Sequence, residues 1–176
     1  MTTTPGQRDD CVFCGIVAGT VPCAKISEDA ATFAFMDIDP GSDGHLLVVP
    51  KRHSADLFDI PAEDLAATTL AAQRIAAAMP AALGAEGVNL LNCSREAAWQ
   101  TVPHFHLHVI PRYRDRSRDR LELPFEPGRP ADHERIARNA ALVAAALRDR
   151  PSVRSDNEHY VISAPEEHSL GLGWSS

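Results

Sequence analysis

The chain has 176 residues, of which 44% are hydrophobic and 23% are charged, and its formal net charge is -7 at pH 7. This composition suits one globular domain and argues against a nucleic-acid-binding protein, which normally presents a basic face. No stretch approaches the roughly 20 apolar residues of a membrane helix, and residues 1–10 lack the apolar region of a signal peptide. We therefore expect a cytoplasmic protein with no nucleic-acid and no membrane partner, and a disordered segment over residues 1–10.

The first half of the chain alternates short strands with turns. A short helix is expected from Cys11 to Gly19, followed by strands over residues 24–28 and 32–37. Residues 39–44 are dense in turn-forming types, and a buried strand follows over residues 45–49. These patterns predict hairpins at the start of the fold.

The second half carries the longer helices. One begins near Pro61, and we expect Pro80 to kink or end it. A strand over residues 88–92 and a histidine-rich strand follow, and then an amphipathic helix from Asp132 to Arg148. This order predicts an α+β fold with an antiparallel sheet. We expect one domain over residues 11–150 and a C-terminal tail over residues 151–176, where apolar periodicity is lost.

The run from His104 to Ile110 holds three histidines at two-residue spacing. In a strand, His104, His106 and His108 share one face, while the residues between them face a core. Three interpretations are open: packing, a metal site, or a nucleophile with helpers. Metal sites with a His-x-His pair usually recruit a carboxylate, and none lies within the run. We favour attack by neutral His106 on an electrophile, with the neighbouring rings holding its tautomer.

Two neighbouring segments support a catalytic interpretation, although neither is specific alone. Gln100 and Thr101 place an amide and a hydroxyl just before the histidines, as an anion-binding turn would. His45 opens a strand directly after a glycine turn, where it can reach a neighbouring strand.

Cys11 and Cys14 form a Cys-x-x-Cys pair, which is typical of half a tetrahedral zinc site. Redox chemistry is the alternative, but no thioredoxin-like strand precedes the pair. The best candidates for the two missing ligands are His53 and His104. Four protein ligands would leave no open position, so the zinc would be structural.

Taken together, these motifs resemble the histidine-triad (HIT) hydrolase family, and specifically its Hint-like branch of nucleoside phosphoramidases. The family signature His-x-His-x-His followed by two hydrophobic residues matches His104 to Ile110. The Hint-like opening Cys-x-Phe-Cys-x-Ile matches Cys11 to Ile16, and the stretch from Phe33 to His53 also matches. The resemblance covers roughly residues 11–114.

The resemblance implies a HIT-like fold, with about five antiparallel strands and two main helices, paired as a homodimer. It implies hydrolysis of purine nucleoside 5'-phosphoramidates, or related phosphate esters, through a nucleotidyl-histidine intermediate. His106 is similar to the family nucleophile, with His108, His45 and Thr101 as its catalytic helpers. The implied nucleotide-binding residues are Asp37, Phe13, Ile16, Phe35, Ile38, Asn92 and Gln100, and the implied zinc ligands are Cys11, Cys14, His53 and His104.

Some features depart from the family pattern. Trp99 stands where many relatives carry glycine, and the loop from Asn92 to His104 is one residue longer. The run from Arg112 to Arg120 holds five arginines and two aspartates. It is either a solvated charged loop or a source of contacts to further phosphates, with Arg112 and Arg114 closest to the site. The alternatives in function are dinucleoside polyphosphate hydrolysis, nucleotidyl transfer, a nucleotide-binding scaffold and a metallohydrolase.

Overall fold

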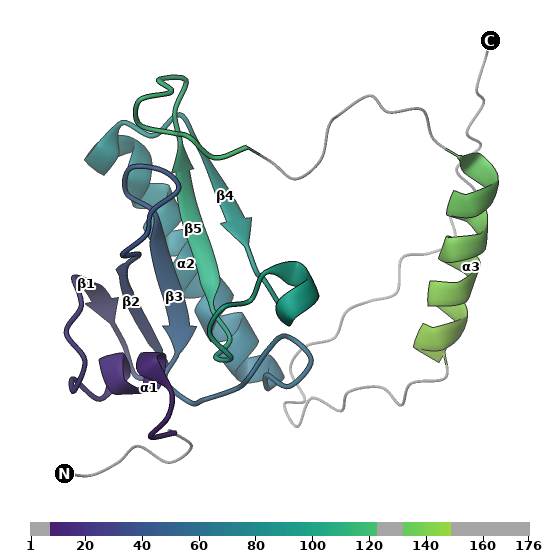
Figure 1. Cartoon of the computed structure of the whole chain (residues 1–176), viewed down its shortest axis with the longest axis horizontal. Helices are drawn as coiled ribbons and strands as arrows, with labels where there is room; N and C mark the ends of the chain where they lie inside the picture. Colours follow the sequence, from purple (N-terminus) through teal and green to yellow (C-terminus); the bar gives the residue numbers. More distant parts are fainter. Residues whose placement is uncertain (1–7, 123–131, 149–176) are drawn as a thin grey trace. The chain divides into compact units, whose positions relative to one another are not determined.

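The computed structural model describes residues 8–122 and 132–148. Five strands form one antiparallel sheet in the order β1-β2-β3-β5-β4 (Figure 1). The strands are β1 (Lys25–Glu28), β2 (Thr32–Met36), β3 (Leu46–Pro50), β4 (Gly87–Leu91) and β5 (Leu107–Arg112). The helices are α1 (Val12–Val17), α2 (Ala62–Leu83), the short 3-10 helix η1 (Glu96–Ala98) and α3 (His133–Arg148). The predicted α+β fold with about five antiparallel strands is confirmed.

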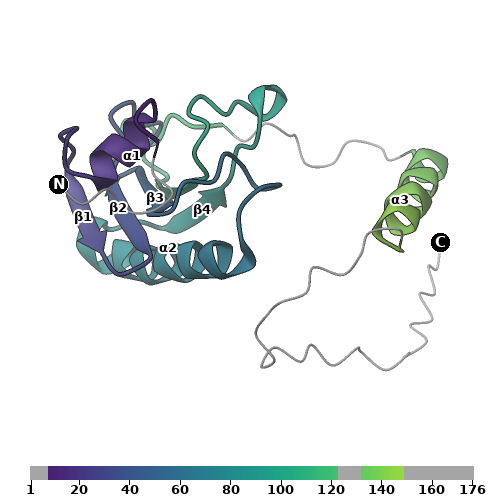
Figure 2. The ribbon, with the colours of Figure 1, turned by 90° about the horizontal axis from the view of Figure 1, so that it is seen from below.

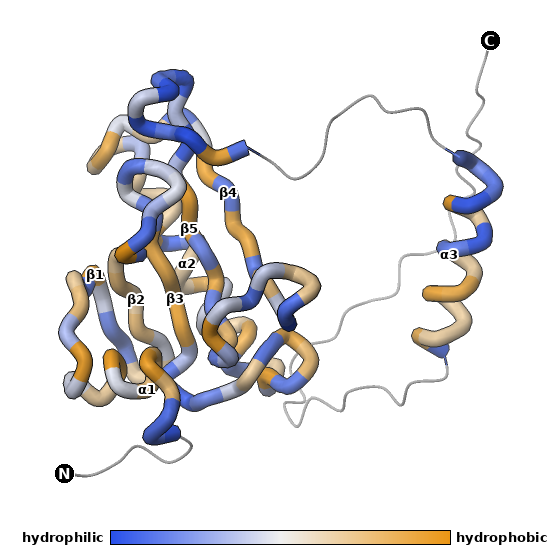
Figure 3. Tube along the Cα trace, in the orientation of Figure 1, coloured by the Kyte–Doolittle hydropathy of each residue, from blue (hydrophilic) through white to orange (hydrophobic). Residues whose placement is uncertain are grey.

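The sheet has an apolar cluster on each face because its strands alternate side chains between the two faces. Figure 2 shows α2 along one face, with α1 and η1 on the other. Figure 3 shows that β2, β3 and β5 carry much of the hydrophobic colour. The α2 side includes Ala34, Leu46, Val48, Ala72, Met79, Phe105, Leu107 and Val109. The α1 side includes Phe13, Ile16, Phe33, Phe35, Leu47 and Val49.

Helix α2 follows Pro61 and carries Glu63 and Asp64 in its first turn, where acidic side chains favour a helix. Pro80 does not end it, because the helix continues to Leu83. The last turn instead closes at Gly84, which adopts a left-handed conformation with φ of 68° and donates its N–H to Pro80 O. Pro80 removes one hydrogen bond from the helix, the one that its own N–H would have made.

The histidine run enters the sheet later than predicted. Strand β5 begins at Leu107, so His104 and His106 lie in the segment that leads into it, and the prediction of a strand from His104 was wrong in its start. Other partners hold this segment: Phe105 N donates to Ser54 O over 2.7 Å. The alternation of side chains persists nonetheless, since Phe105, Leu107 and Val109 all pack on the α2 side.

Helix α3 belongs to a separate compact unit. Asp132 caps it by accepting from Arg135 N over 2.9 Å, and its apolar side chains Ile136, Val143 and Leu147 are exposed. The predicted tail over residues 151–176 lies outside the described residues, as do residues 1–7, so the domain boundaries and the disorder of residues 1–10 stay predictions. No helix in residues 8–122 or 132–148 is long and apolar enough to cross a membrane.

Candidate active site and metal centre

The three histidine rings lie on the α1 side of the sheet, as the two-residue spacing predicts. His104 and His106 are buried, with exposed fractions of 0% and 3%. The rings of His106 and His108 lie 4.8 Å apart between centroids, and Phe13 of α1 packs edge-on against His106 at 5.3 Å. Helix α1 therefore covers the ring of His106.

The tautomer of His106 follows from its hydrogen bond. Its Nδ1 lies 2.7 Å from His104 O, and a carbonyl oxygen only accepts, so Nδ1 carries the proton. The lone pair of Nε2 is then available for attack. The backbone of the same residue is held by Asn92, whose Nδ2 donates to His106 O over 2.9 Å. Ring and main chain are both anchored beside the free nitrogen.

His45 and His108 form a second, linked pair. Gly41 N donates to His45 Nδ1 over 3.3 Å, so His45 carries its proton on Nε2. That nitrogen lies 3.0 Å from His108 Nδ1, which must accept, leaving the proton of His108 on Nε2. Asp37 Oδ2 lies 3.6 Å from His45 Nε2 and 4.0 Å from His108 Nδ1. The chain of donors leaves one N–H of His108 to offer to a ligand.

Burial keeps these rings neutral at pH 7. It lowers the pKa of His108 to about 4, with the neighbouring His106 and His45 acting in the same direction. Burial also lowers the pKa of His45 and of His106, although the nearby Asp37 opposes the shift in both. A neutral imidazole keeps a lone pair, so His106 can act as a nucleophile at neutral pH.

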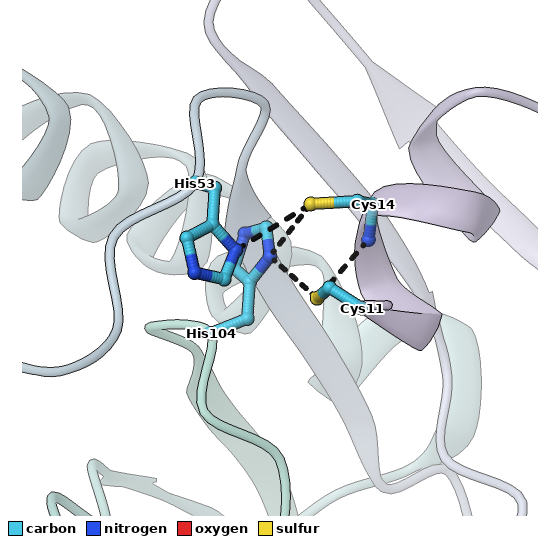
Figure 4. Close-up of side chains that lie close together, drawn as sticks. All are labelled: Cys11, Cys14, His53 and His104. Atoms are coloured by element: carbon cyan, nitrogen blue, oxygen red, sulfur yellow. Dashed lines mark hydrogen bonds between the residues drawn. The ribbon is translucent and has the colours of Figure 1, made fainter. Parts of the chain in front are cut away.

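Cys11, Cys14, His53 and His104 converge on one point from three separate segments (Figure 4). His104 Nδ1 lies 3.4 Å from Cys11 Sγ and 3.6 Å from Cys14 Sγ, and His53 Nδ1 lies 3.5 Å from Cys14 Sγ. Tetrahedral zinc with its usual bond lengths separates a sulfur and a nitrogen ligand by about 3.6 Å. The donor set and its spacing therefore fit a zinc ion.

The ring orientation of His104 agrees with this fit. Its Nε2 lies 3.0 Å from Pro50 O and must donate, so its lone pair is on Nδ1, toward the cysteines. Burial lowers the pKa of His104 to about 4 and raises the pKa of the Cys14 thiol to about 11. Metal binding would displace the thiol protons, since zinc binds thiolates.

The residues predicted to bind the purine and the ribose lie in three different environments. Phe13, Ile16 and Phe35 are buried in the cluster beneath α1, and the rings of Phe13 and Phe35 meet edge-on at 5.4 Å. Asp37 lies at the histidine pair. Ile38 is 98% exposed, so within the part of the chain that the structure describes it lies outside the buried cluster of the other three.

The loop between β4 and β5 uses its predicted phosphate-binding amides to hold its own shape. Gln100 Nε2 donates to Ala55 O over 2.6 Å and to Val102 O over 3.1 Å, while Gln100 Oε1 accepts from Arg95 N over 2.5 Å. Asn92 Oδ1 accepts from Ser94. Thr101 is exposed. The side chains of Asn92 and Gln100 are therefore held by hydrogen bonds within the protein.

The arginines after β5 are engaged with acidic groups. Arg112 pairs with buried Asp119 over 2.6 Å and also donates to Asn89 and to Leu121 O. The other ion pairs are Arg114 with Glu86, Arg116 with Glu122 and Arg118 with Asp43. Arg112 is the last residue of β5. It lies about 20 Å along the chain from His106, which precedes that strand. These contacts favour the solvated-loop interpretation.

Sequence reasoning missed the backbone groups that orient the rings. Gly41 N, Pro50 O and His104 O each settle which nitrogen of a catalytic or metal-binding histidine carries the proton. Every residue has the same backbone groups, so no sequence pattern marks these three positions.

Comparison with known proteins agrees with this geometry. The HIT domain family model matches residues 18–115. An uncharacterised HIT-like protein of Mycobacterium tuberculosis is 45% identical over 113 residues, which cover 64% of this chain and 76% of that protein. An adenosine 5'-monophosphoramidase of Schizosaccharomyces pombe is 39% identical over 102 residues, covering 58% of this chain and 74% of the relative.

A solved structure of a relative shares the fold. The zinc-bound histidine triad family protein of Mycobacterium smegmatis is 41% identical, with a TM-score of 0.61, and the match covers 78% of this chain and 97% of that one. The family model spans more than half of the chain and includes the whole histidine run. The chain belongs to the HIT domain family.

Proposed function

We propose that this protein hydrolyses purine nucleoside 5'-phosphoramidates, or related nucleoside phosphate esters, through a nucleotidyl-histidine intermediate. The observation that carries the proposal is the state of His106: buried, neutral, with Nδ1–H held by His104 O and Nε2 free. Relatives that are named adenosine 5'-monophosphoramidases support a nucleotide as the substrate.

The reaction has two displacements. His106 Nε2 attacks the α-phosphorus, the bond from phosphorus to the leaving amine breaks, and the amine keeps the electron pair and takes a proton from solvent. Water then attacks the phosphorus and gives up a proton to solvent, the P–Nε2 bond breaks with its electron pair returning to Nε2, and the monophosphate leaves. His108 Nε2–H and the Thr101 hydroxyl are the groups we assign to the phosphate oxygens, where fixed donors stabilise developing charge. The side-chain amide of Asn92 holds His106 in place by donating to the backbone carbonyl of His106.

On the nucleoside side, we assign the base to the apolar cluster of Phe13, Ile16 and Phe35, whose side chains would have to shift to present an apolar surface because all three are buried. Asp37 offers two acceptor oxygens to the ribose hydroxyls. Ile38 would have to turn inward to complete the surface. Gln100 would reach the leaving-group side only by giving up its bonds to Ala55 O and Val102 O.

Rapid-quench mass spectrometry with adenosine 5'-phosphoramidate tests the mechanism. The expected result is one adenylyl group on the peptide that contains His106, absent in His106→Ala. Turnover retained by His106→Ala would overturn the assignment. Tight AMP binding with no adduct in the wild type would instead favour a nucleotide-binding scaffold.

Dinucleoside polyphosphate hydrolysis and nucleotidyl transfer are the competing activities. The paired arginines of residues 112–118 give little support to a longer phosphate chain. Comparing kcat/KM for adenosine phosphoramidate and diadenosine polyphosphate separates these activities. We expect the phosphoramidate to be the better substrate.

Cys11, Cys14, His53 and His104 would hold zinc as a structural ion. When bound, the ion would cross-link α1, the segment after β3 and the segment before β5. A metallohydrolase would lose activity on chelation before it lost stability, whereas a structural ion predicts that stability falls first.

We also propose a homodimer in the cytoplasm. Strand β4 is an edge strand with exposed Leu90 and Leu91, and pairing with a second copy would cover both its backbone and these side chains. The four cysteines are free, which suits a reducing compartment.

A further inference from the structure

The loop between β4 and β5 lies on the opposite flank of His106 from the proposed nucleoside surface. Helix α1 packs on β2 and β3, and strand β5 lies between β3 and β4 in the sheet. Helix η1 follows β4 and rises from the same face as α1 (Figure 2). If the nucleoside occupies the α1 side, the group that leaves phosphorus points toward η1.

This loop is tied to the site and to a second loop. Its first residue, Asn92, donates to His106 O, and Gln100 near its end donates to Val102 O, two residues before His104. Across to residues 54–58, Leu57 N donates to Ser94 Oγ over 3.1 Å and Gln100 Nε2 donates to Ala55 O. The two loops therefore form one connected surface.

Backbone conformation marks both ends of η1. Arg95 and Trp99 have φ of 70° and 64°, and they are the two non-glycine residues with positive φ among those that the structure describes. A bulky residue in this region is strained, and glycine would adopt it freely. Trp99 is nevertheless 68% exposed, so burial of the indole offsets little of the backbone strain. A strained, exposed indole beside a proposed site suggests a role in binding.

The neighbouring loop adds a second exposed ring. Phe58 is 64% exposed, and the guanidinium carbon of Arg95 lies 4.3 Å from the centroid of its ring. Arg95 Nε also pairs with Asp56 Oδ2 over 3.1 Å, so the positive charge is already partnered. The surface thus offers the exposed Trp99 indole and the part of the Phe58 ring that Arg95 leaves uncovered, rather than a free cation.

We propose that Trp99 and Phe58 form an aromatic rim that selects leaving amines carrying an aromatic ring. The inference rests on the proposed phosphoramidase function and names the class of its leaving group. Aromatic pairs contribute about 0.5–1.5 kcal/mol beyond area burial, which corresponds to a preference of roughly two- to tenfold per ring contacted.

The test compares two adenosine 5'-phosphoramidates, one with an N-(2-phenylethyl) group and one with an N-butyl group. Trp99→Gly should lower the ratio of their kcat/KM values by about two- to tenfold. Trp99→Phe should keep most of the preference, and Phe58→Ala should reduce it independently. Ile26→Ala, which shortens an exposed side chain on β1 at the other edge of the sheet, is the matched control.

Stability gives an independent readout for the same variant. Trp99→Gly should raise Tm, because glycine relieves the positive φ, so any loss of preference cannot come from unfolding. An unchanged ratio in Trp99→Gly, with turnover of the unsubstituted substrate intact, overturns the rim alone. Absence of turnover of all three phosphoramidates by the wild type overturns the proposed function instead.

Discussion

At the scale of single residues, equal spacing in the sequence leads to unequal environments. His104 donates to Pro50 O and turns its lone pair to the cysteines, whereas His106 donates through Nδ1 to a backbone carbonyl. His108 accepts from His45. The partner of each ring, rather than its position in the run, decides which nitrogen is free and hence what the ring can do.

The depressed pKa of His108 predicts a dependence of stability on pH. Its pKa is about 4 in the folded state and about 6.5 when unfolded, so the unfolded state binds more protons between these values. The contribution of neutral His108 to the free energy of unfolding is fully present above pH 6.5 and is lost as the pH falls toward 4. His108→Asn should flatten that part of the loss. Thermal melts of both proteins from pH 7.5 to 4.5 check this, and parallel curves would contradict it.

At the scale of elements, close approach of backbone segments constrains the turn between β2 and β3. Gly44 has φ of 87°, and a Cβ there would lie 2.5 Å from Leu83 Cδ1 and 3.2 Å from Pro111 Cγ. The turn is therefore pressed against the end of α2 and against β5. This contact also sets the position of His45, the next residue in the chain.

Gly44→Ala should destabilise the fold through both strain and contact. Strain alone costs about 1 kcal/mol, and the contact with Leu83 adds to it. Gly84→Ala is the matched control, since Gly84 has φ of 68° but no atom within 4 Å of its Cβ position. Urea unfolding should show a larger fall in the free energy of unfolding for Gly44→Ala. Equal falls would show that the packing contact contributes nothing.

At the scale of the whole molecule, the Cys/His cluster joins segments that the sheet does not join. Cys11 and Cys14 belong to the start of α1, while His53 follows β3 and His104 precedes β5. The cluster lies beside His106, because His104 O also holds the ring of that residue. Zinc would therefore stabilise the fold and the orientation of the nucleophile together.

Removal of zinc should lower Tm. Cys14→Ser should reduce the zinc content, measured by elemental analysis, and lower Tm to a similar extent as chelation does. Cys23→Ser is the control, because Cys23 lies outside the cluster. Full zinc content in Cys14→Ser would contradict the proposed ligand set.

The exposed edge strand β4 allows a test of the proposed homodimer. Leu90→Lys on β4 should shift the protein from dimer to monomer, since a charge at an edge opposes strand pairing. Ile26→Lys on β1, the other edge strand, should leave the dimer intact. Light scattering measures both. A monomeric wild type would overturn the proposed dimer.

Much of the fold and of the candidate site was readable in the sequence because periodicity and residue chemistry are local properties. Alternation over residues 32–37 and the buried-looking apolar run over residues 45–49 predicted strands. The side-chain types of Cys11, Cys14 and the histidines predicted a metal centre and a nucleophile. The start of β5 was placed too early because Phe105 N bonds to Ser54 O, which no local pattern shows.

The sequence by itself determined the α+β class, the two faces of the histidine run and the set of side chains able to attack, donate or bind a metal. Only the tertiary structure decided the protonated nitrogen of each histidine, the pairing of Arg112 with Asp119 and the exposure of Ile38 and Trp99. The reason is physical: side-chain chemistry belongs to a residue, whereas hydrogen-bond partners and burial depend on segments distant in the chain.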